Sequence, residues 1–345
     1  MKKIIQKYTG FFRNIRVLHY IYNLLHRKGL KHNKHLYPYF EISNSVYSSI
    51  SHKNFIGKKA KAPWLDGFFN ADDIQNHPAY CHFPENIRTQ LLSWHKNGYL
   101  IWERFLDEET VDAVNNEIDG LLEKKEVDFN YTNRKIFNAY HQSYTIRKII
   151  KEKRLLELLS FILDKKVLPF QTINFLKGSE QLPHADSIHM STFPQGYLIA
   201  AWFALEDISA EQGPLCYFPE SHRLPYITNA DYANTSNRFM LDGDANKKYE
   251  AVAASVIQEH AFQKEIFLAK KGDVLIWHGN LIHGGEPMLN KELTRKSFVV
   301  HYFAADVIAY HEISERPAIF DTELVGEVED DFYKGQTHLL EMKLD

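Results

Sequence analysis

From residue 167 onward, the sequence is a succession of short apolar runs separated by turn residues. The runs are "VLPFQTINFL", "GYLIAAWFAL", "GPLCYFP", "DVLIWHG" and "KSFVVHYF". Several short strands at such spacing are typical of a β-sandwich or barrel. The pattern therefore predicts a fold that is mainly β with flanking helices.

Upstream of these runs, the pattern changes to one strand followed by one helix. In "NGYLIWERFLDEETVDAVNNEIDGLLEKK", a strand is predicted at 99–102. A helix is predicted to begin near Asp107, because acids fill its first turn and lysines its end. A chain of 345 residues, 44% of them hydrophobic, is long enough to bury one large core.

The stretch "LPHADSIH" contains a histidine and an acid separated by one residue, His184 and Asp186. In an extended segment both side chains leave the same face and can converge on one ion. With one further histidine from a distant strand, they would form the two-histidine, one-carboxylate triad of non-haem Fe(II) oxygenases. Such a spacing also occurs by chance, and the alternative interpretation is a surface pair.

A second stretch, "GDVLIWHGNLIHGG", supports the metal interpretation, because it supplies His283 at the end of a strand. Arg295 follows on the next predicted strand, where it can bind a dicarboxylate through paired, charge-assisted hydrogen bonds. Ser297 lies two positions further on, so it shares a face with Arg295 and can donate to the same carboxylate.

Four other histidines have structural interpretations, and two of them also have functional ones. His278 is an odd number of positions before His283 and is predicted to face the opposite side of its strand. His189 and His222 are candidates for the wall of a substrate pocket or for satisfied loop residues, and His301 for a core residue under the pocket.

These motifs resemble the phytanoyl-CoA dioxygenase family of Fe(II)/2-oxoglutarate-dependent oxygenases. The matching segments run from "NGYLIWERFLDEETVDAVNNEID" through "FQTINFLKGSEQLPHAD", "AAWFALEDISAEQGPLCYFPESHR" and "GDVLIWHGNLIHGG" to "TRKSFVVHYF", about residues 97–303. In "PESH", Glu220 stands where the family usually has glycine.

The resemblance implies a double-stranded β-helix, or jelly roll, with iron on His184, Asp186 and His283. It implies that Arg295 binds the distal carboxylate of 2-oxoglutarate. It also suggests that Gln171 and Asn174, on the strand before the metal motif, touch this cosubstrate.

The implied reaction consumes dioxygen and 2-oxoglutarate and hydroxylates a carbon of the substrate. Relatives that halogenate lack the carboxylate that Asp186 provides here. The resemblance leaves open a small-molecule, acyl or glycan-type substrate. The alternatives are a non-catalytic jelly roll that binds a metal or ligand and a cupin enzyme that uses no keto acid. Arg295 counts against both.

We expect three parts in the chain. Residues 1–86 are predicted as a basic N-terminal extension and connecting segment, 87–310 as the jelly-roll domain, and 311–345 as a C-terminal tail. The polar stretch 225–262 lies where a jelly roll needs only a turn, and long insertions of this kind usually form lids or disordered loops. We predict that it covers the active site and that its second half is helical.

The N-terminal extension is strongly basic. Residues 1–40 contain nine Lys and Arg and no acid, which leaves 32 basic against 44 acidic residues in the remainder. Apolar residues recur along it at helical spacing: Ile4, Tyr8, Phe11, Ile15, Leu18, Tyr22 and Leu25. This face is predicted either to lie on a membrane or to pack on the main domain.

The remaining composition points to the cytoplasm. Cys81 and Cys216 cannot form a disulfide framework and are interpreted as buried thiols of a reducing compartment. No apolar run approaches the roughly 20 residues that span a bilayer. We expect a small-molecule substrate and no nucleic acid, and the sequence contains no indication of oligomeric state.

Overall fold

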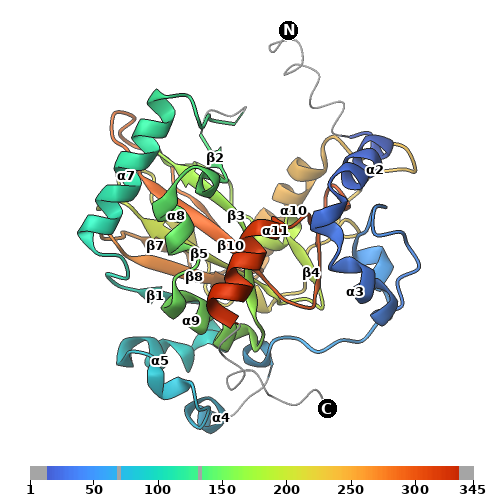
Figure 1. Ribbon diagram of the computed structural model, residues 1–345, viewed down its shortest axis with the longest axis horizontal. Helices are drawn as coiled ribbons and strands as arrows, with labels where there is room; N and C mark the ends of the chain where they lie inside the picture. The colour runs from blue at the N-terminus through green and yellow to red at the C-terminus, as the bar shows by residue number, and fades with distance from the viewer. Residues whose placement is uncertain (1–13, 68–70, 131–133, 334–345) are drawn as a thin grey trace.

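A six-stranded antiparallel sheet lies at the centre of the computed structural model, which describes residues 14–67, 71–130 and 134–333 (Figure 1). Its strand order is β1-β8-β5-β10-β3-β2. The strands are β1 (Tyr99–Trp102), β8 (Val274–His278), β5 (Leu198–Ala204), β10 (Ser297–Ala304), β3 (Val167–Phe175) and β2 (Ile136–Phe137). Four of the five predicted runs are strands of this sheet.

The two faces of this sheet bury different partners. On β10, Phe298 and Val300 belong to an apolar cluster shared with the helices, whereas Val299 belongs to a cluster on the opposite face. This alternation follows from the two-residue period of a strand. Each fully buried side chain of this size contributes about 1.5–3 kcal/mol.

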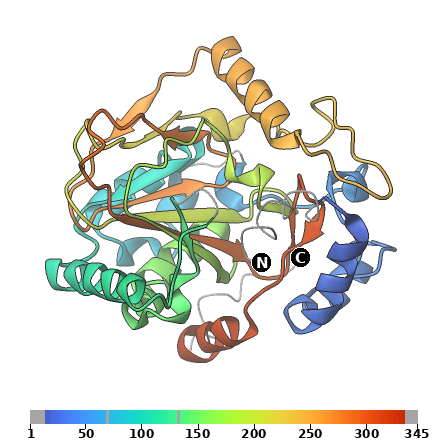
Figure 2. The ribbon, with the colours of Figure 1, turned by 90° about the horizontal axis from the view of Figure 1, so that it is seen from above.

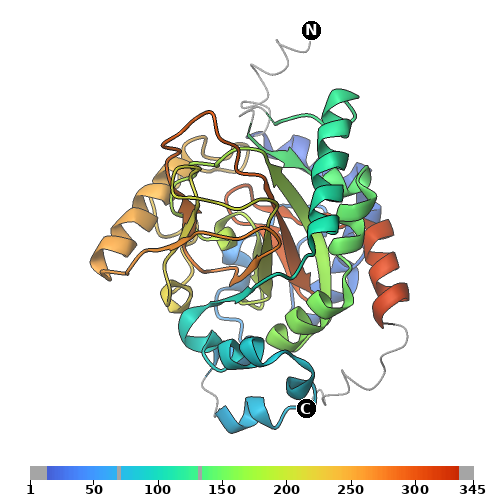
Figure 3. The ribbon, with the colours of Figure 1, turned by 90° about the vertical axis from the view of Figure 1, so that its left-hand side faces the viewer.

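Four helices cover the first face: α7 (Glu108–Glu123), α8 (Tyr144–Ile149), α9 (Lys153–Leu163) and α11 (Thr322–Val328). Figure 3 shows these helices on one side of the sheet and α10 (Ala245–Glu259) on the other. The predicted helix start is confirmed, because the side chain of Asp107 caps α7 by accepting from Thr110 N at 2.7 Å.

Two three-stranded sheets lie on the second face. One is β7-β6-β9 (Glu265–Phe267, Leu215–Tyr217, His283–Gly285), and the other is β12-β11-β4 (Arg316–Pro317, Ile308–His311, Ser191–Phe193). Leu215 and Phe267 of the first small sheet pack against Trp202 and Leu275 of the large sheet. The antiparallel sheets therefore enclose an interior between them.

The expectation of a mainly β fold is not confirmed. The described residues are about 37% helical and 18% strand. Many of the helical residues lie before residue 167, outside the strand-rich region from which the expectation came. Among the described residues, the other α-helices are α2 (Arg16–Leu25), α3 (Asn33–Tyr39), α4 (Ala71–Gln75), α5 (Glu85–Leu91) and α6 (Trp94–Asn97). Short helices complete the list: η1 (Arg27–Leu30), η2 (His52–Phe55), η3 (Trp64–Asp66), η4 (Tyr80–His82), η5 (Ala139–His141), η6 (Asp186–Ile188), η7 (Ser221–Arg223) and η8 (Glu329–Tyr333).

Both predicted flanks pack onto the central unit. Leu36 and Tyr37 of α3 share an apolar cluster with Phe193 of β4 and Ile308 of β11. Residues 311–333, predicted as a tail, contain β12, α11 and η8 and contribute buried side chains to the helix-side core. Residues 311–333 are therefore part of the packed structure, and Figure 2 shows α11 (red) beside the helices that cover the large sheet. Residues 334–345 lie outside the described residues.

The two cysteines are free, but they differ in exposure. Cys216 is buried, as expected, whereas Cys81 is exposed, so the interpretation of both as buried thiols was wrong for Cys81. Within the described ranges, no helix is long and apolar enough to span a bilayer.

Candidate metal centre

His184 and His283 are brought together by the backbone although they are far apart in the sequence. They form an isolated antiparallel bridge, in which each N–H donates to the carbonyl of the other residue at 2.9 Å. Ala185 has an extended backbone, and Asp186 follows it as the first residue of η6. The one-residue spacing turns His184 and Asp186 toward the same point.

The three side chains converge in the interior. Asp186 Oδ1 lies 3.7 Å from His283 Nε2 and 3.9 Å from His184 Nε2. One possible ligand atom from each residue lies within 4.8 Å of the other two, and all three residues are buried. Two imidazoles and one carboxylate are the donor set of mononuclear non-haem Fe(II) sites with open coordination positions.

The second ring nitrogen of each histidine is held by a backbone carbonyl. His184 Nδ1 donates to Leu182 O at 2.9 Å, and His283 Nδ1 donates to Leu281 O at 3.0 Å. Because a carbonyl oxygen only accepts, a neutral ring keeps its proton on Nδ1 and leaves a lone pair on Nε2, which in His184 lies 2.9 Å from the amide nitrogen of Gln181. A metal ligand requires this tautomer, so the residues fit a divalent iron.

The second oxygen of Asp186 is held from the large sheet. Trp277 Nε1 donates to Oδ2 at 2.9 Å, and His301 Nε2 lies 3.3 Å from the same oxygen. Burial alone would raise the pKa of Asp186, but His283, His301 and His184 outweigh it and hold this pKa well below its usual value. The carboxylate is therefore ionised. Its other oxygen, Oδ1, faces His184 and His283.

Arg295 is a buried cation close to these residues. It is 2% exposed, and its Nη1 donates to Ser297 Oγ at 2.8 Å. The rings of Phe175 and Trp202 lie 5.1 and 5.6 Å from its guanidinium carbon. Burial lowers the pKa of Arg295 to about 10, although Glu206 acts in the opposite direction. Its Nε has no hydrogen-bond partner among the described residues, so the group is suited to an anionic ligand.

One cavity of about 1100 Å³ connects these groups. His184, Asp186, His283 and Arg295 all line it, and so does Gln171, which was predicted to touch the cosubstrate. A cavity of this size can hold a keto acid together with a second small molecule.

Two other predicted residues do not line this cavity. Ile173 and Phe175 of β3 belong to the cluster on its cavity side, so Asn174 between them faces the helix layer. The structure therefore does not bring Asn174 to the site. Ser297 is fully buried and reaches the cavity only through its bond to Arg295.

The other histidines separate into two groups. His189 lines the cavity, and His301 lines it beside Asp186. His278 faces away, as predicted, and its Nε2 lies 3.0 Å from Asp66 Oδ2. His222 packs 5.3 Å from His278 by ring centroids and does not line the cavity.

The sequence interpretation missed Lys135. Its side chain lines the cavity, donates to Gln181 Oε1 at 2.7 Å, and lies near enough to Asp186 and Arg295 to interact electrostatically. Burial lowers the pKa of Lys135, with the negative Asp186 opposing the shift. No local pattern marks this residue, because it precedes the two-residue strand β2 and reaches the site only through the pairing of β2 with β3.

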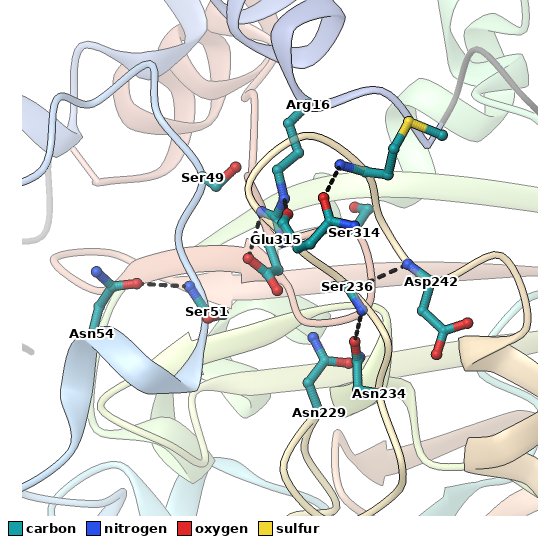
Figure 4. Close-up of polar contacts among 12 residues, drawn as sticks. Arg16, Ser49, Ser51, Asn54, Asn229, Asn234, Ser236, Asp242, Ser314 and Glu315 are labelled. Carbon is teal, nitrogen blue, oxygen red and sulfur yellow. Dashed lines mark hydrogen bonds and ion pairs between the residues drawn. The ribbon is translucent and has the colours of Figure 1, made fainter.

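Residues from the insertion and the N-terminal segment border the same cavity. Leu241, Asp242 and Asn246 come from 225–262, whose second half is helical as predicted, and Asn14 and Tyr22 come from the N-terminal segment. Figure 4 shows Arg16 of α2 directed at Glu315, close to the insertion residues Ser236 and Asp242. The Arg16 Nη1–Glu315 Oε2 distance is 2.6 Å.

Comparison with known proteins identifies relatives of the chain. The family model described as Phytanoyl-CoA dioxygenase (PhyH) matches residues 94–297. A Dictyostelium discoideum phytanoyl-CoA dioxygenase domain-containing protein 1 homolog is 27% identical over 132 residues, covering 37% of this chain and 42% of the relative. The corresponding Danio rerio protein is matched over 46% of its length, so the chain spans less than half of these two relatives. An Arabidopsis thaliana phytanoyl-CoA dioxygenase is 22% identical over 63% of this chain and 88% of the relative.

Solved structures resemble the fold. The non-heme alpha ketoglutarate dependent carbocyclase SnoK from nogalamycin biosynthesis has a TM-score of 0.54 at 18% identity, over 75% of this chain and 98% of the other. EctD from S. alaskensis, with 2-oxoglutarate and 5-hydroxyectoine, has a TM-score of 0.50 at 19% identity, over 63% and 75%. At these identities the likeness establishes a shared fold with antiparallel sheets.

Proposed function

The chain belongs to the phytanoyl-CoA dioxygenase family, and from this premise we propose that it is an Fe(II)/2-oxoglutarate-dependent dioxygenase that hydroxylates a small-molecule, acyl or glycan-type substrate. The observation that carries the proposal is the meeting of two chemistries in one cavity. The convergent Nε2, Nε2 and Oδ1 atoms of His184, His283 and Asp186 suit iron, and Arg295 suits a carboxylate.

His184, Asp186 and His283 would hold the metal. When bound, iron together with 2-oxoglutarate and dioxygen supplies the oxidation, in which the keto acid is converted to succinate and carbon dioxide. The protein contributes orientation. The carbonyls of Leu182 and Leu281 fix the imidazole tautomers.

Arg295 would bind the distal carboxylate of 2-oxoglutarate. Its unpaired Nε lies in a region lined by Phe175 and Trp202, where exclusion of water strengthens an ion pair. Gln171 borders the same space and is a second candidate contact. A non-catalytic metal-binding jelly roll, or a cupin without a keto acid, has no use for this buried guanidinium, so Arg295 favours the dioxygenase.

The insertion 225–262 would act as a cover for the cavity. Its residues Leu241 and Asn246 line the cavity wall, and Tyr249 is bonded to the backbone of the metal motif through Ala185. A cover excludes water from the reacting groups. We also propose a cytoplasmic location, based on the lack of a disulfide framework in the sequence.

The test is an anaerobic titration of metal-free protein. Addition of Fe(II) and 2-oxoglutarate is expected to give a weak visible charge-transfer band with one iron per chain. Asp186→Ala should abolish the band. The matched control is Asp242→Asn, which alters a buried carboxylate at the same cavity outside the triad and should retain it. A band that persists in Asp186→Ala, or none in folded wild-type protein, contradicts the proposal.

A further inference from the structure

Helix α2 presents its apolar side chains to solvent. Seven large hydrophobic residues of this ten-residue helix are exposed, with exposed fractions from 38% to 75%. They are Val17, Leu18, Tyr20, Ile21, Tyr22, Leu24 and Leu25. A contiguous apolar surface of this kind marks an interaction site in a stable protein.

Polar contacts hold α2 in this orientation. Its two buried residues are His19 and Asn23, and Asn23 Nδ2 donates to Tyr47 O at 2.9 Å. Arg16 adds its ion pair with Glu315 and a bond from Nε to Asn237 O at 2.7 Å. A rotation that buried the leucines would break these bonds. Of the predicted apolar face, Leu18, Tyr22 and Leu25 are therefore exposed, whereas Ile15 is half-buried and forms an isolated bridge with Met240. Ile4, Tyr8 and Phe11 lie outside the described residues.

Positive charge follows the apolar face directly. Arg27, Lys28, Lys31 and Lys34 are all exposed, and the first acid of the chain is Glu41. Within the described part of the chain, none of these four basic side chains forms an ion pair. Exposed apolar residues followed in the chain by exposed basic ones are the composition of an interfacial segment on an anionic lipid surface.

We propose that α2 and the basic segment after it dock the protein on an anionic lipid surface. The basic residues after α2 favour an anionic lipid surface as the partner, because anionic headgroups would neutralise their charge. Leu18, Ile21 and Leu25 would then enter the boundary between headgroups and acyl chains. Tyr22 of the same helix lines the cavity of the candidate metal centre, so the docked surface borders that cavity. The inference goes beyond the proposed oxygenase activity. Binding to lipid requires neither iron nor 2-oxoglutarate.

The experiment is co-sedimentation of the full chain with two kinds of vesicle, phosphatidylcholine alone and phosphatidylcholine mixed with phosphatidylglycerol. The full chain is expected to bind the anionic vesicles and to lose binding as salt rises. The variant Leu18→Asn/Ile21→Asn/Leu25→Asn should lose at least about tenfold in binding. Each substitution Arg27→Gln, Lys28→Gln, Lys31→Gln or Lys34→Gln should weaken binding about fivefold.

The matched control is Ile56→Asn/Leu289→Asn, because both residues are 75% exposed, as Leu25 is, and lie outside α2. This control should bind like the unaltered chain. Thermal melting of every variant separates lost binding from lost folding. Equal sedimentation of the α2 variant, or no preference for anionic vesicles, overturns the proposal. The unaltered chain could instead be a dimer that binds no lipid, and the α2 variant a monomer. That result would assign the apolar face to contact with a second copy of the chain. An outcome that contradicts lipid binding does not change the result expected from the iron titration. The two proposals can therefore fail separately.

Discussion

The metal centre and helix α2 depart from the usual distribution of polar and apolar groups in opposite directions. At the centre, Asp186 and Arg295 are ionisable groups only 5% and 2% exposed. On α2, Val17 and Leu25 are apolar groups 60% and 75% exposed. The first region buries charged side chains, and the second exposes hydrocarbon side chains to water.

Both departures cost free energy, and both are held by specific bonds. An ion taken from water into the interior costs several kcal/mol, which Trp277 and the histidines offset for Asp186. Each large apolar side chain left in water forgoes about 1.5–3 kcal/mol, and the bonds of Asn23 and Arg16 keep α2 in that position. Neither the buried charges nor the exposed apolar residues stabilise the fold. We therefore explain each set by a ligand that it binds.

The largest effect is expected for Arg295→Ala. Removing the guanidinium would leave the 2-oxoglutarate carboxylate that it is proposed to bind unpaired in a buried site, so keto-acid binding should weaken by about 2–5 kcal/mol. Iron binding should be nearly unchanged, because Arg295 is not one of the three convergent residues. Calorimetry of 2-oxoglutarate binding to the metal-loaded protein measures the difference.

Two further variants make the Arg295 result specific. Arg295→Lys should recover only part of the binding, because an ammonium cannot form the paired bonds of a guanidinium. Lys296→Ala is the control: this neighbouring cation pairs with Asp119 at 2.8 Å and should not affect 2-oxoglutarate. Full keto-acid affinity in Arg295→Ala would move the carboxylate site elsewhere and favour the cupin alternative.

A smaller effect is expected for Trp277→Phe. This change keeps an aromatic ring but removes the N–H that donates to Asp186 Oδ2, so iron affinity should fall about 10–100-fold. Competition with a metal chelator measures it. Trp94→Phe is the control, because Trp94 is a buried indole of the helix-side core whose Nε1 has no partner among the described residues. Equal affinities would mean that Trp277 does not orient the carboxylate.

The sequence predicted what depends on local pattern. The strand at 99–102 and the helix after Asp107 are both present, because period-two burial and a capping carboxylate act within a few residues. The spacing of His184 and Asp186 likewise predicts that their side chains share one side, since a single extended residue separates them. The stretch "GDVLIWHGNLIHGG" offered His283, and the family resemblance then implied its role as the third ligand, because no local pattern links it to the other two.

The sequence could not predict what depends on pairing between distant segments. Trp277 reaches Asp186 only because β8 pairs with β5 in a register that no short window specifies. Lys135 depends in the same way on β2. Periodicity on α2 identified an apolar face but not its surroundings, since those are decided by the bonds of Asn23 and Arg16. The expected helix content was too low because it was based on the strand-rich residues after 167, whereas most helices lie before them.

A cost of about 1 kcal/mol is expected for Tyr249→Phe, which tests whether the insertion is tied to the centre. Ala185 N–H, between the two residues of the metal motif, donates to Tyr249 Oη at 2.7 Å, and the change leaves it unpaired. Proteolysis near 230–247 should become faster and should slow when iron and 2-oxoglutarate are added. Tyr232→Phe, in the same insertion but bonded to Asn229, is the control. Cleavage that ligands do not affect in any variant would contradict a covering role.

The smallest effect belongs to a charge outside both regions. Glu327 accepts from Arg147 and from Lys151, each at 2.6 Å, and these bonds lower the pKa of Glu327 from 4.5 to about 2. Because the pKa is lower in the folded chain, the stabilisation is present above pH 4.5 and is lost as the pH falls toward 2. Glu327→Gln should therefore cost less than about 1 kcal/mol at pH 7, since the pair is partly exposed to water.

Urea denaturation of the Glu327→Gln variant at pH 7 and at pH 4 measures this pair, and the gap from the unaltered chain should narrow at the lower pH. Glu323→Gln is the control, because Glu323 contacts the same Arg147 at 3.1 Å but is 79% exposed, and it should cost still less. A loss of unfolding free energy in Glu327→Gln well above about 1 kcal/mol would mean that partial exposure does not weaken this ion pair. The contrast between the buried charges of the centre and the partly exposed charges of the surface would then lose its physical basis.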